Sequence, residues 1–388
     1  MKILIISHEY PPVGGGGANA CRFLAERFAD RGNSVHVLTA DYGGITSPEI
    51  TYGGLLTVTR VRAKRHSRDS CSAAEMFDYL KEAAKEADRI LASEEFDICL
   101  CFFGIPGGVL ASRLKKKYGL RYVVRMGGGD IPGFQQRFKL LYRIVQPELR
   151  MIWKDADALV CNSEGLRELA SEFCDKYPIR VIPNGVDTKL YHPAEERNGI
   201  ETANAEGPDT VQLLTVSRLI ARKGMQDLIP EIRWLENRTG RNICWTIAGD
   251  GPYRSALEML ASECDVEDRI VFAGRTDGNE TAELYRSADI FAFPSYKEGM
   301  PNAVLEAMAS GLPVVMKRSC QGAAELVRDN GALSDESFAD ALAEVIEGGR
   351  KRWREMGAAS RRIVNEEFTW EHISERYLNL LGSIISDE

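Results

Sequence analysis

Short apolar runs alternate with amphipathic helical segments along almost the whole chain of 388 residues. The apolar residues of each run are consecutive and often β-branched, as in KILIIS (2–7) and VQLLTVS (211–217). A strand that is apolar on both faces belongs in a parallel sheet that helices cover on both sides. The pattern therefore predicts an α/β protein built from doubly wound, Rossmann-like parallel sheets.

The length of the chain favours two domains, because a single hydrophobic core rarely grows to this size. Residues 183–209 are rich in Pro, Gly and charge and have no apolar period, so we expect the domain boundary there. The segments ADALVCNS (156–163) and ADIFAFPS (288–295) share one pattern, which we interpret as equivalent strands of two similar halves. We predict domains over 1–186 and 187–369, with a binding cleft between them at the carboxyl ends of both sheets.

The composition excludes several classes of protein. No run approaches 18 consecutive apolar residues, and the N-terminal segment lacks the core and cleavage site of a signal peptide, so we expect a cytoplasmic protein. Nine cysteines show neither CxxC nor zinc-binding spacing, which predicts reduced thiols and no structural metal. A net charge of −8 without a recognition motif argues against nucleic acid as a partner.

Four consecutive glycines in HEYPPVGGGGANA (8–20) lie between the first predicted strand and a predicted helix. Glycines let an anion approach the unpaired N–H groups of a helix N-terminus, which favours phosphate. The run is neither a P-loop, since GK[ST] is absent, nor a dinucleotide fingerprint, since it starts too far from the strand and Asn19 replaces the third glycine. Two alternatives remain: a surface loop without a ligand, and a nicotinamide-dependent Rossmann oxidoreductase in which Asp41 binds the ribose.

The stretch PSYKEGMPNAVLEAMASGLPVV predicts an almost wholly apolar helix that begins at Pro301 and ends at Gly311. Its polar residues form one stripe with a spacing of four, together with a preceding acid: Glu298, Asn302, Glu306 and Ser310. A carboxylate on such a helix needs strong partners. The vicinal hydroxyls of a ribose or hexose would satisfy Glu306, and the alternative is that it caps another element inside the protein.

Further candidate residues follow other predicted strands of the second half. In VSRLIARKG, Arg218 comes just after a strand and Lys223 just before a helix. Fixed cations at the carboxyl edge of a parallel sheet suit a pyrophosphate, although solvated surface charges are the alternative. In IAGDGPYR, Gly249 and Gly251 form a strand-to-helix turn where a ligand can approach the backbone.

In this order, EYPPVGGGGANA, TVSRLIARKG, IAGDGP and FPSYKEGMPNAVLEAMASGLPVV resemble the large retaining glycosyltransferase family 4, of GT-B fold. The resemblance spans nearly the whole chain and includes the E-x7-E signature, as Glu298 and Glu306. It implies an acceptor-side first domain, a second domain that binds the donor, and a last helix, about 370–388, that packs back on the first. It also implies a catalytic group of three residues, namely Glu298 at the transferred sugar and Arg218 and Lys223 at the donor pyrophosphate. The donor-binding residues that it implies are Gly16, Gly17, Gly249, Gly251, Gly299, Met300, Pro301, Asn302 and Glu306.

The implied reaction moves a sugar from a UDP- or GDP-sugar to an acceptor hydroxyl, with retention at the anomeric carbon and without a metal or other cofactor. We expect a part in cell-surface glycan or glycolipid synthesis, which the basic segment 113–154 described below suggests. One motif departs from the family, because VVRMGGGD has Gly127 where the family has a His, although Asp130 matches as an acceptor-side residue. His8 is a candidate substitute, and Arg125 is out of register. A noncatalytic protein of GT-B fold that binds nucleotide sugars is therefore a further alternative.

Two charged segments complete the sequence predictions. Asp155 and Asp157 in KDADALV have the D-x-D pattern of metal-binding GT-A transferases, but we assign them a structural role because Asp157 leads into a predicted strand. Residues 113–154 hold eleven Lys and Arg residues against only Asp130 and Glu148, interleaved with apolar residues. Such a surface can dock on anionic lipid. We expect a lipid-linked or glycan acceptor and a peripheral position on the inner face of the cell membrane, the alternative being a solvated basic face.

Overall fold

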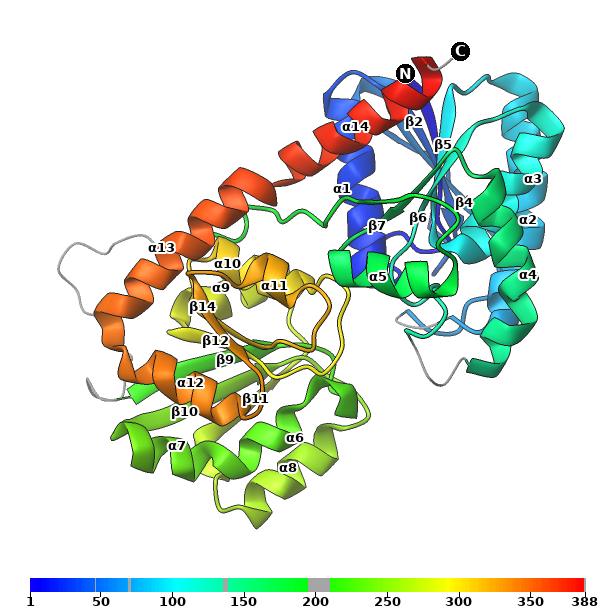
Figure 1. Cartoon of the computed structure of the whole chain (residues 1–388). Helices are drawn as coiled ribbons and strands as arrows, with labels where there is room; N and C mark the ends of the chain where they lie inside the picture. The colour runs from blue at the N-terminus through cyan, green and yellow to red at the C-terminus, as the bar shows by residue number, and fades with distance from the viewer. Residues whose placement is uncertain (46, 69–70, 135–138, 195–209, 387–388) are drawn as a thin grey trace. The chain divides into compact units, whose positions relative to one another are not determined.

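The computed structural model describes residues 1–45, 47–68, 71–134, 139–194 and 210–386, in two compact units (Figure 1). The first unit is Met1–Asn184 with Trp370–Glu388, and the second is Gly185–Thr369. This division lies two residues from the predicted one, between 186 and 187. Most of the segment in which we expected the boundary, 195–209, lies outside the described residues.

The first unit contains an eight-stranded sheet in the order β3-β4-β2-β1-β5-β6-β7-β8. All neighbours are parallel except β3 and β4. The strands are β1 (Lys2–Ile6), β2 (Ser34–Ala40), β3 (Glu49–Thr51), β4 (Leu56–Val61), β5 (Ile98–Phe102), β6 (Tyr122–Arg125), β7 (Ala158–Cys161) and β8 (Ile179–Val181). The helices are α1 (Gly16–Asp30), α2 (Ala73–Ser93), α3 (Val109–Tyr118), α4 (Lys139–Asp155), α5 (Glu164–Phe173) and α14 (Trp370–Ser386), and a π-helical turn, η2 (Phe103–Gly108), follows β5.

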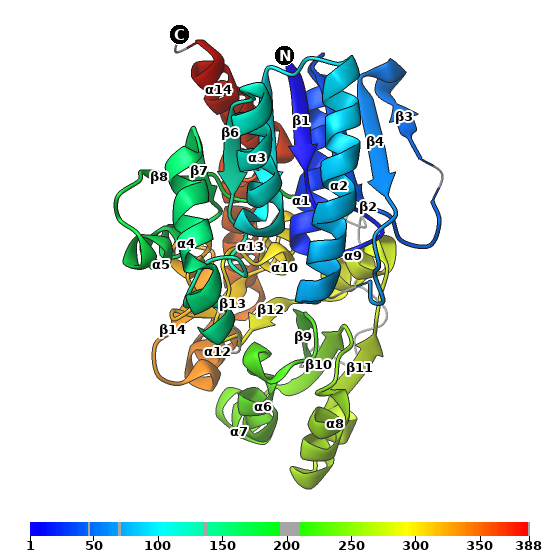
Figure 2. The same ribbon diagram turned by 90° about the vertical axis from the view of Figure 1, so that its right-hand side faces the viewer.

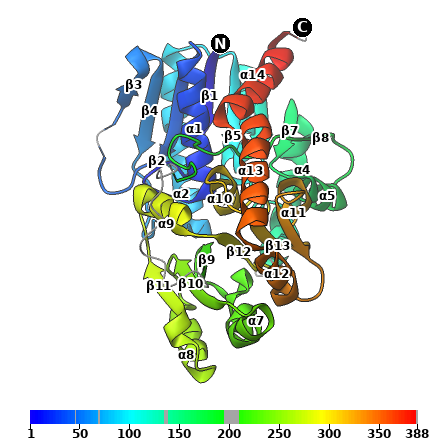
Figure 3. The same ribbon diagram turned by 90° about the vertical axis from the view of Figure 1, so that its left-hand side faces the viewer.

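Helices cover both faces of this sheet, as the consecutive apolar runs predict. Along β1, Leu4 and Ile6 pack against one set of helices, α2 to α5 (Figure 2). Ile3 and Ile5 point to the opposite face and pack with α1 and α14 (Figure 3). The last helix is thus part of the first unit.

The second unit contains a parallel six-stranded sheet in the order β11-β10-β9-β12-β13-β14. The strands are β9 (Thr210–Val216), β10 (Asn242–Ala248), β11 (Ile270–Gly274), β12 (Ile290–Phe293), β13 (Val314–Lys317) and β14 (Gly331–Ser334). The helices are α6 (Met225–Leu228), α7 (Ile232–Thr239), α8 (Arg254–Glu263), α9 (Gly278–Ser287), α10 (Asn302–Ala309), α11 (Ala323–Leu326), α12 (Phe338–Glu347) and α13 (Gly349–Glu367). Buried clusters on both faces give this sheet two cores. The predicted α/β class with two parallel sheets is confirmed.

The repeated pattern in 156–163 and 288–295 has another origin than the one we expected. The two segments contain β7 and β12, but β7 is third from the central β1, whereas β12 is the direct neighbour of the central β9. The strands are therefore not equivalent. What they share is local, because Asp157 accepts a hydrogen bond from the backbone N–H of Tyr122 at 2.8 Å, and Asp289 one from Gln212 at 2.9 Å. Each Asp accepts a hydrogen bond from the backbone of the neighbouring strand in its sheet. Asp157 therefore has the structural role predicted for it.

Candidate active site

The candidate residues of the second unit gather at one edge of its sheet. Because β9, β10 and β12 are parallel neighbours, the loops that follow them leave the same edge. Exposed Arg218 follows β9, the turn with Gly249 and Gly251 follows β10, and Glu298 follows β12. The fold thus brings together residues that are about 80 positions apart in the sequence.

Lys223 and Glu298 form an ion pair. Nζ of Lys223 lies 2.9 Å from Oε1 of Glu298, and only 13% and 14% of the two side chains is exposed. The Ser295 hydroxyl donates a hydrogen bond of 2.7 Å to the same oxygen, and the Lys223 ammonium lies 5.1 Å from the centre of the Phe293 ring. Gly224 fixes the approach of the two loops: its φ is +74°, and a Cβ there would lie 2.1 Å from the Pro294 carbonyl oxygen. Glu298 is therefore held in one place by its neighbours.

The helix after this loop carries Glu306. Pro301 is the N-cap and α10 begins at Asn302, one residue later than predicted, and Gly311 follows its end with a φ of +76°. Met300 is buried, and Gly299 lies against Gly322, where a Cβ would be 2.6 Å from the Gly299 carbonyl oxygen. The loop before α10 is thus closely packed.

Glu306 is partly exposed and has a partner inside the protein. Its Oε2 lies 3.0 Å from the Tyr285 hydroxyl, which also lies 2.9 Å from the Ala303 carbonyl oxygen. Burial raises the pKa of Glu306 to about 7. A phenol has a single proton, so when Tyr285 donates to Ala303, a protonated Glu306 can donate to Tyr285. The carboxyl group is therefore poised to change its charge near neutral pH, as groups in binding sites often are.

Gly249 and Gly251 have a packing role that the sequence analysis did not foresee. Gly249 has a φ of +130°, and a Cβ there would lie 1.9 Å from the Ser217 carbonyl oxygen. A Cβ at Gly251 would lie 2.2 Å from the Leu219 carbonyl oxygen. Both positions must therefore be glycine for the loops after β9 and β10 to meet, whether or not a ligand is bound.

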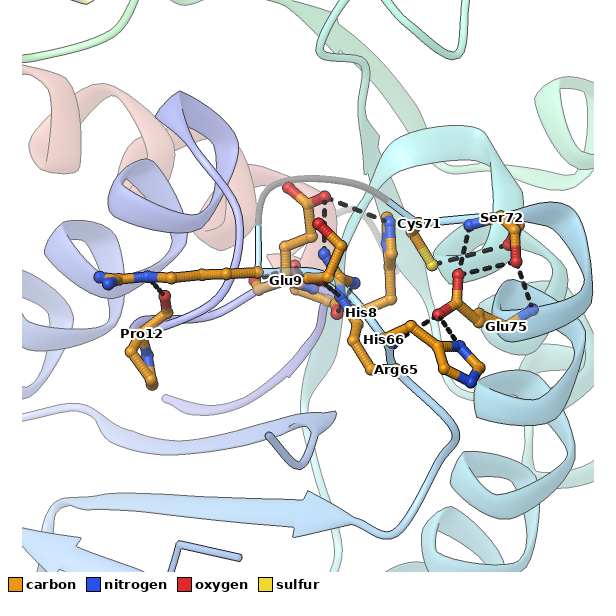
Figure 4. Close-up of polar contacts among 11 residues, drawn as sticks. His8, Glu9, Pro12, Arg65, His66, Cys71, Ser72 and Glu75 are labelled. Carbon is orange, nitrogen blue, oxygen red and sulfur yellow. Dashed lines mark hydrogen bonds and ion pairs between the residues drawn. The ribbon is translucent and has the colours of Figure 1, made fainter. Parts of the chain in front are cut away.

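In the first unit, the glycine run bends around a carboxylate. Gly15 is the N-cap of α1, and a Cβ at the preceding Gly14 would lie 2.7 Å from Oε2 of Glu9. Nη2 of Arg65 lies 3.5 Å from Oε1 of Glu9, and Nε2 of His8 lies 3.7 Å from it (Figure 4). Gly16 and Gly17 form the first turn of α1, next to this cluster. Glu9 and Arg65 were not predicted as site residues, because they are 56 positions apart and no local sequence pattern links them.

Asp130 and Arg125 are engaged within the protein. Oδ1 of Asp130 accepts the backbone N–H of Gly127 and Oδ2 that of Gly104, both at 2.9 Å. Arg125 is buried and donates to the side chain of Asn184. The carboxylate of Asp130 therefore joins two loops, one through each oxygen.

The ring of Phe103 fills the space beside Gly127. A Cβ at Gly127 would lie 2.8 Å from Cε1 of that ring, and a Cβ at Gly17 would lie 2.7 Å from Cζ. His8 does not take the place of the missing His with a charged ring. It is buried, and burial lowers the pKa of His8 to about 3, so its imidazole is neutral. Phe103, like Glu9 and Arg65, was not among the predicted site residues.

None of the helices in the described ranges has the length and apolar character needed to cross a bilayer. Within the same ranges, no three His, Cys, Asp or Glu side chains cluster in a way that could hold a metal ion.

Comparison with known proteins gives consistent matches over both units. A family model described as Glycosyltransferase Family 4 matches residues 14–190, and one described as Glycosyl transferases group 1 matches residues 197–362. A GDP-mannose-dependent monoacylated alpha-(1-6)-phosphatidylinositol monomannoside mannosyltransferase of Corynebacterium glutamicum is 33% identical over 98% of both chains. An alpha-monoglucosyldiacylglycerol synthase of Streptococcus pneumoniae is 30% identical over 81% of this chain and 70% of its own. The solved structure of sucrose-phosphate synthase from Thermosynechococcus elongatus matches all of both chains with a TM-score of 0.81 and 21% identity.

Proposed function

The chain belongs to glycosyltransferase family 4 and has the GT-B fold, and from this premise we propose that it is a retaining, metal-independent enzyme. It transfers a sugar from a nucleoside-diphosphate sugar to a hydroxyl of a glycan or lipid-linked acceptor. The predicted family and fold are confirmed, and the oxidoreductase alternative is wrong. Asp41, on which that alternative depended, accepts the backbone N–H of Ile45 in the turn after β2.

The observation that carries the proposal is the Lys223–Glu298 ion pair at the carboxyl edge of the second sheet. Negative charge grows on the departing diphosphate in the transition state, and fixed cations stabilise that charge. Arg218 and Lys223 supply the cations, and the N-terminus of α10 adds a partial positive charge. The carboxylate of Glu306 then holds the ribose diol through two hydrogen bonds.

The proposed enzyme retains the configuration at the anomeric carbon, because the nucleoside diphosphate leaves and the acceptor hydroxyl attacks on the same face of the sugar. A nucleophilic carboxylate would have to be free to form a covalent bond with the anomeric carbon. Oε1 of Glu298 is already bound by the Lys223 ammonium and the Ser295 hydroxyl. In our proposal Glu298 therefore accepts hydrogen bonds from the transferred sugar, and Arg218, Lys223 and the N-terminus of α10 stabilise the leaving group.

The proposed acceptor is lipid-linked, and the names of relatives that act on phosphatidylinositol mannosides and diacylglycerols support this choice. We propose that only part of the segment 113–154 contacts the membrane, because long-range ion pairs compensate most of the positive charge of α3. Its cations meet acids from outside the segment: Lys115 with Asp157 at 2.7 Å, Lys116 with Asp155 at 3.6 Å, and Arg113 and Lys117 with Asp88 at 2.6 and 3.1 Å.

Helix α4 is the better candidate for the membrane contact. It presents an exposed stripe with helical spacing: Arg143, Ile144, Pro147, Arg150, Met151 and Lys154. The side chain of Ile144 is 70% exposed, which is unusual for so large an apolar residue. Cations beside exposed apolar side chains suit an anionic lipid surface, so we propose that the protein is cytoplasmic and binds the inner face of the membrane through α4. The side chains of residues 135–141, part of the predicted basic segment, lie outside the described residues.

A panel of UDP-, GDP- and ADP-sugars tests the proposed function. We expect one donor to protect the protein against thermal unfolding and to release its nucleoside diphosphate in the presence of EDTA. Release that depends on added Mg²⁺ would contradict metal independence. Protection without release would favour the noncatalytic alternative, which the glycine at position 127 keeps open.

A further inference from the structure

The carboxyl ends of β1 and β5 lie side by side in the middle of the first sheet. From β1 the chain passes through α1 to β2 on one side, whereas β5 lies on the other side of β1. Ligands of open α/β sheets bind beyond the carboxyl ends at such a reversal of strand order. Glu9 comes shortly after β1 and Phe103 directly after β5, so both lie at this position.

The carboxylate of Glu9 contacts a buried arginine on one side and remains partly exposed to solvent. Arg65, of which only 2% is exposed, lies 3.5 Å from Oε1 and is itself fixed by donating to the carbonyl oxygens of His8 and Ser67. Burial raises the pKa of Glu9, and the neighbouring Arg65 guanidinium and Gly15 N–H oppose that rise by favouring the ionised carboxylate. The Glu9 side chain nevertheless keeps 18% of its surface exposed. A fixed, partly exposed carboxylate can accept hydrogen bonds from two adjacent hydroxyls.

Phe103 is also fixed by its neighbours, and its backbone has an unfavourable conformation. Its φ is +67°, a value that bulky residues rarely adopt. Such strain persists only where the surroundings impose it, and it clusters at ligand sites. Gly17 and Gly127 both leave room for the ring, and its edge meets the His8 ring with the centroids 5.1 Å apart. The ring is nevertheless partly exposed.

We propose that Glu9 and Phe103 form a subsite for a pyranose ring, with Glu9 binding adjacent hydroxyls and Phe103 packing against the apolar C–H face. An aromatic ring and a carboxylate match the two kinds of surface that a pyranose presents. This subsite also accounts for Gly127, because a side chain there would displace the Phe103 ring. The inference rests on the proposed function only for the origin of the sugar, which belongs to the donor or to the acceptor.

Saturation-transfer NMR with methyl α-D-glucopyranoside and methyl α-D-mannopyranoside tests the subsite on the full chain with UDP or GDP present. We expect Phe103→Ala and Glu9→Gln each to weaken binding of one of these pyranosides about tenfold, roughly the loss of one good contact. Phe103→Leu, which keeps an apolar side chain but no ring, should weaken it too. Two variants in α2 are controls and should change nothing: Phe77→Ala at an exposed position, and Glu82→Gln at a half-buried position that pairs with Lys85.

Two results would overturn the subsite: no pyranoside bound by the wild-type protein, or wild-type binding by folded Phe103→Ala and Glu9→Gln variants. Thermal unfolding of each variant establishes that it is folded. Donor hydrolysis then identifies the source of the sugar. A raised KM for the donor in both variants assigns the subsite to the donor sugar, and an unchanged KM with weaker pyranoside binding assigns it to the acceptor. If no donor is hydrolysed at all, the proposed function fails, while the NMR result still decides the subsite.

Discussion

The ammonium of Lys223 and the carboxylate of Glu298 lie 2.9 Å apart, although 75 residues separate them in the sequence. Their loops follow β9 and β12, which are neighbours in the sheet, so the parallel topology itself creates the pair. Both side chains are largely buried, and a buried charge that loses its partner is costly. In our proposal, losing either residue of the pair therefore lowers both the free energy of unfolding and the rate of sugar transfer.

Replacing Lys223 with Ala should lower turnover by about 10²–10³, the usual cost of losing one group that stabilises transition-state charge. Glu298→Gln should also reduce turnover, and the two changes should not add in stability, with a coupling of about 0.5–3 kcal/mol. Release of nucleoside diphosphate and urea unfolding measure the two effects. Lys317→Ala is a matched control, since Lys317 pairs with Asp227 at 2.6 Å at the end of β13. Equal losses of turnover in both lysine variants would argue against a special role for Lys223.

Glu306 should make both stability and nucleotide binding depend on pH. The folded protein keeps its proton up to a pKa of about 7, whereas the unfolded chain releases it near 4.5. Between these values the folded state binds more protons, so the contribution of this group to the free energy of unfolding falls as pH rises from about 4.5 to 7. Glu306→Gln should remove that slope in urea unfolding measured from pH 5 to 8.

Protonation of Glu306 should weaken its proposed contact with the ribose. Only the ionised carboxylate can accept two hydrogen bonds from the diol, so wild-type affinity for UDP or GDP should decrease as pH falls below about 7. Glu306→Gln should bind more weakly and show only the pH dependence of the nucleotide itself. Calorimetric titrations at several pH values measure this, and identical slopes for the two proteins would show that Glu306 is not the ribose ligand.

Asp130→Asn should act on stability rather than on donor binding. Both oxygens accept backbone N–H groups, and an amide can replace only one of them without placing two donors together. We expect a loss of about 1–3 kcal/mol in the free energy of unfolding, the cost of an unsatisfied buried group. Asp41→Asn, at a turn that accepts one N–H group, should cost less. A large rise in the KM for the acceptor without a loss of stability would support the predicted acceptor-side role of Asp130.

The sequence predicted what depends on local patterns. Consecutive apolar runs of the kind seen in β1 and β9 require cover on both faces, and the structure has helices on both faces of each sheet. The position of Lys223 and Glu298 at one edge also follows from strand order in a parallel sheet. The family signature predicted which residues form the site, and no periodicity could supply that prediction.

The sequence could not predict contacts between distant segments. A charge count over 113–154 omitted Asp88, Asp155 and Asp157, which the fold places against the α3 cations. The glycine at position 127 looked like a missing side chain, whereas the structure shows the ring of Phe103 beside it. Such contacts depend on how loops from different strands meet. The residues next to each position in the sequence do not indicate this.

Gly127→Ala should therefore depend on Phe103. The added methyl group would lie 2.8 Å from the ring, so the ring must shift and stability should fall by about 1–3 kcal/mol, as for other overpacked sites. In a Phe103→Ala background the same change should cost almost nothing. Urea unfolding of the four proteins measures this coupling. Additive losses would mean that the strain at position 127 arises elsewhere, and the fit between ring and glycine would not explain the missing side chain.

Membrane binding should depend on α4 more than on α3. Replacing both Arg143 and Lys154 with Gln removes two exposed cations, neither of which has an ion-pair partner among the described residues. At about 1 kcal/mol for each cation near an anionic surface, partition onto phosphatidylserine vesicles should fall roughly 30-fold. The matched change of Lys116 and Lys117 to Gln should have a smaller effect, because Asp155 and Asp88 already compensate these charges.

Flotation of the vesicles with each variant at low and high salt measures the difference. Equal losses from the two helices would assign the contact to the whole basic segment, and vesicle binding that is insensitive to salt would rule out the electrostatic contact altogether.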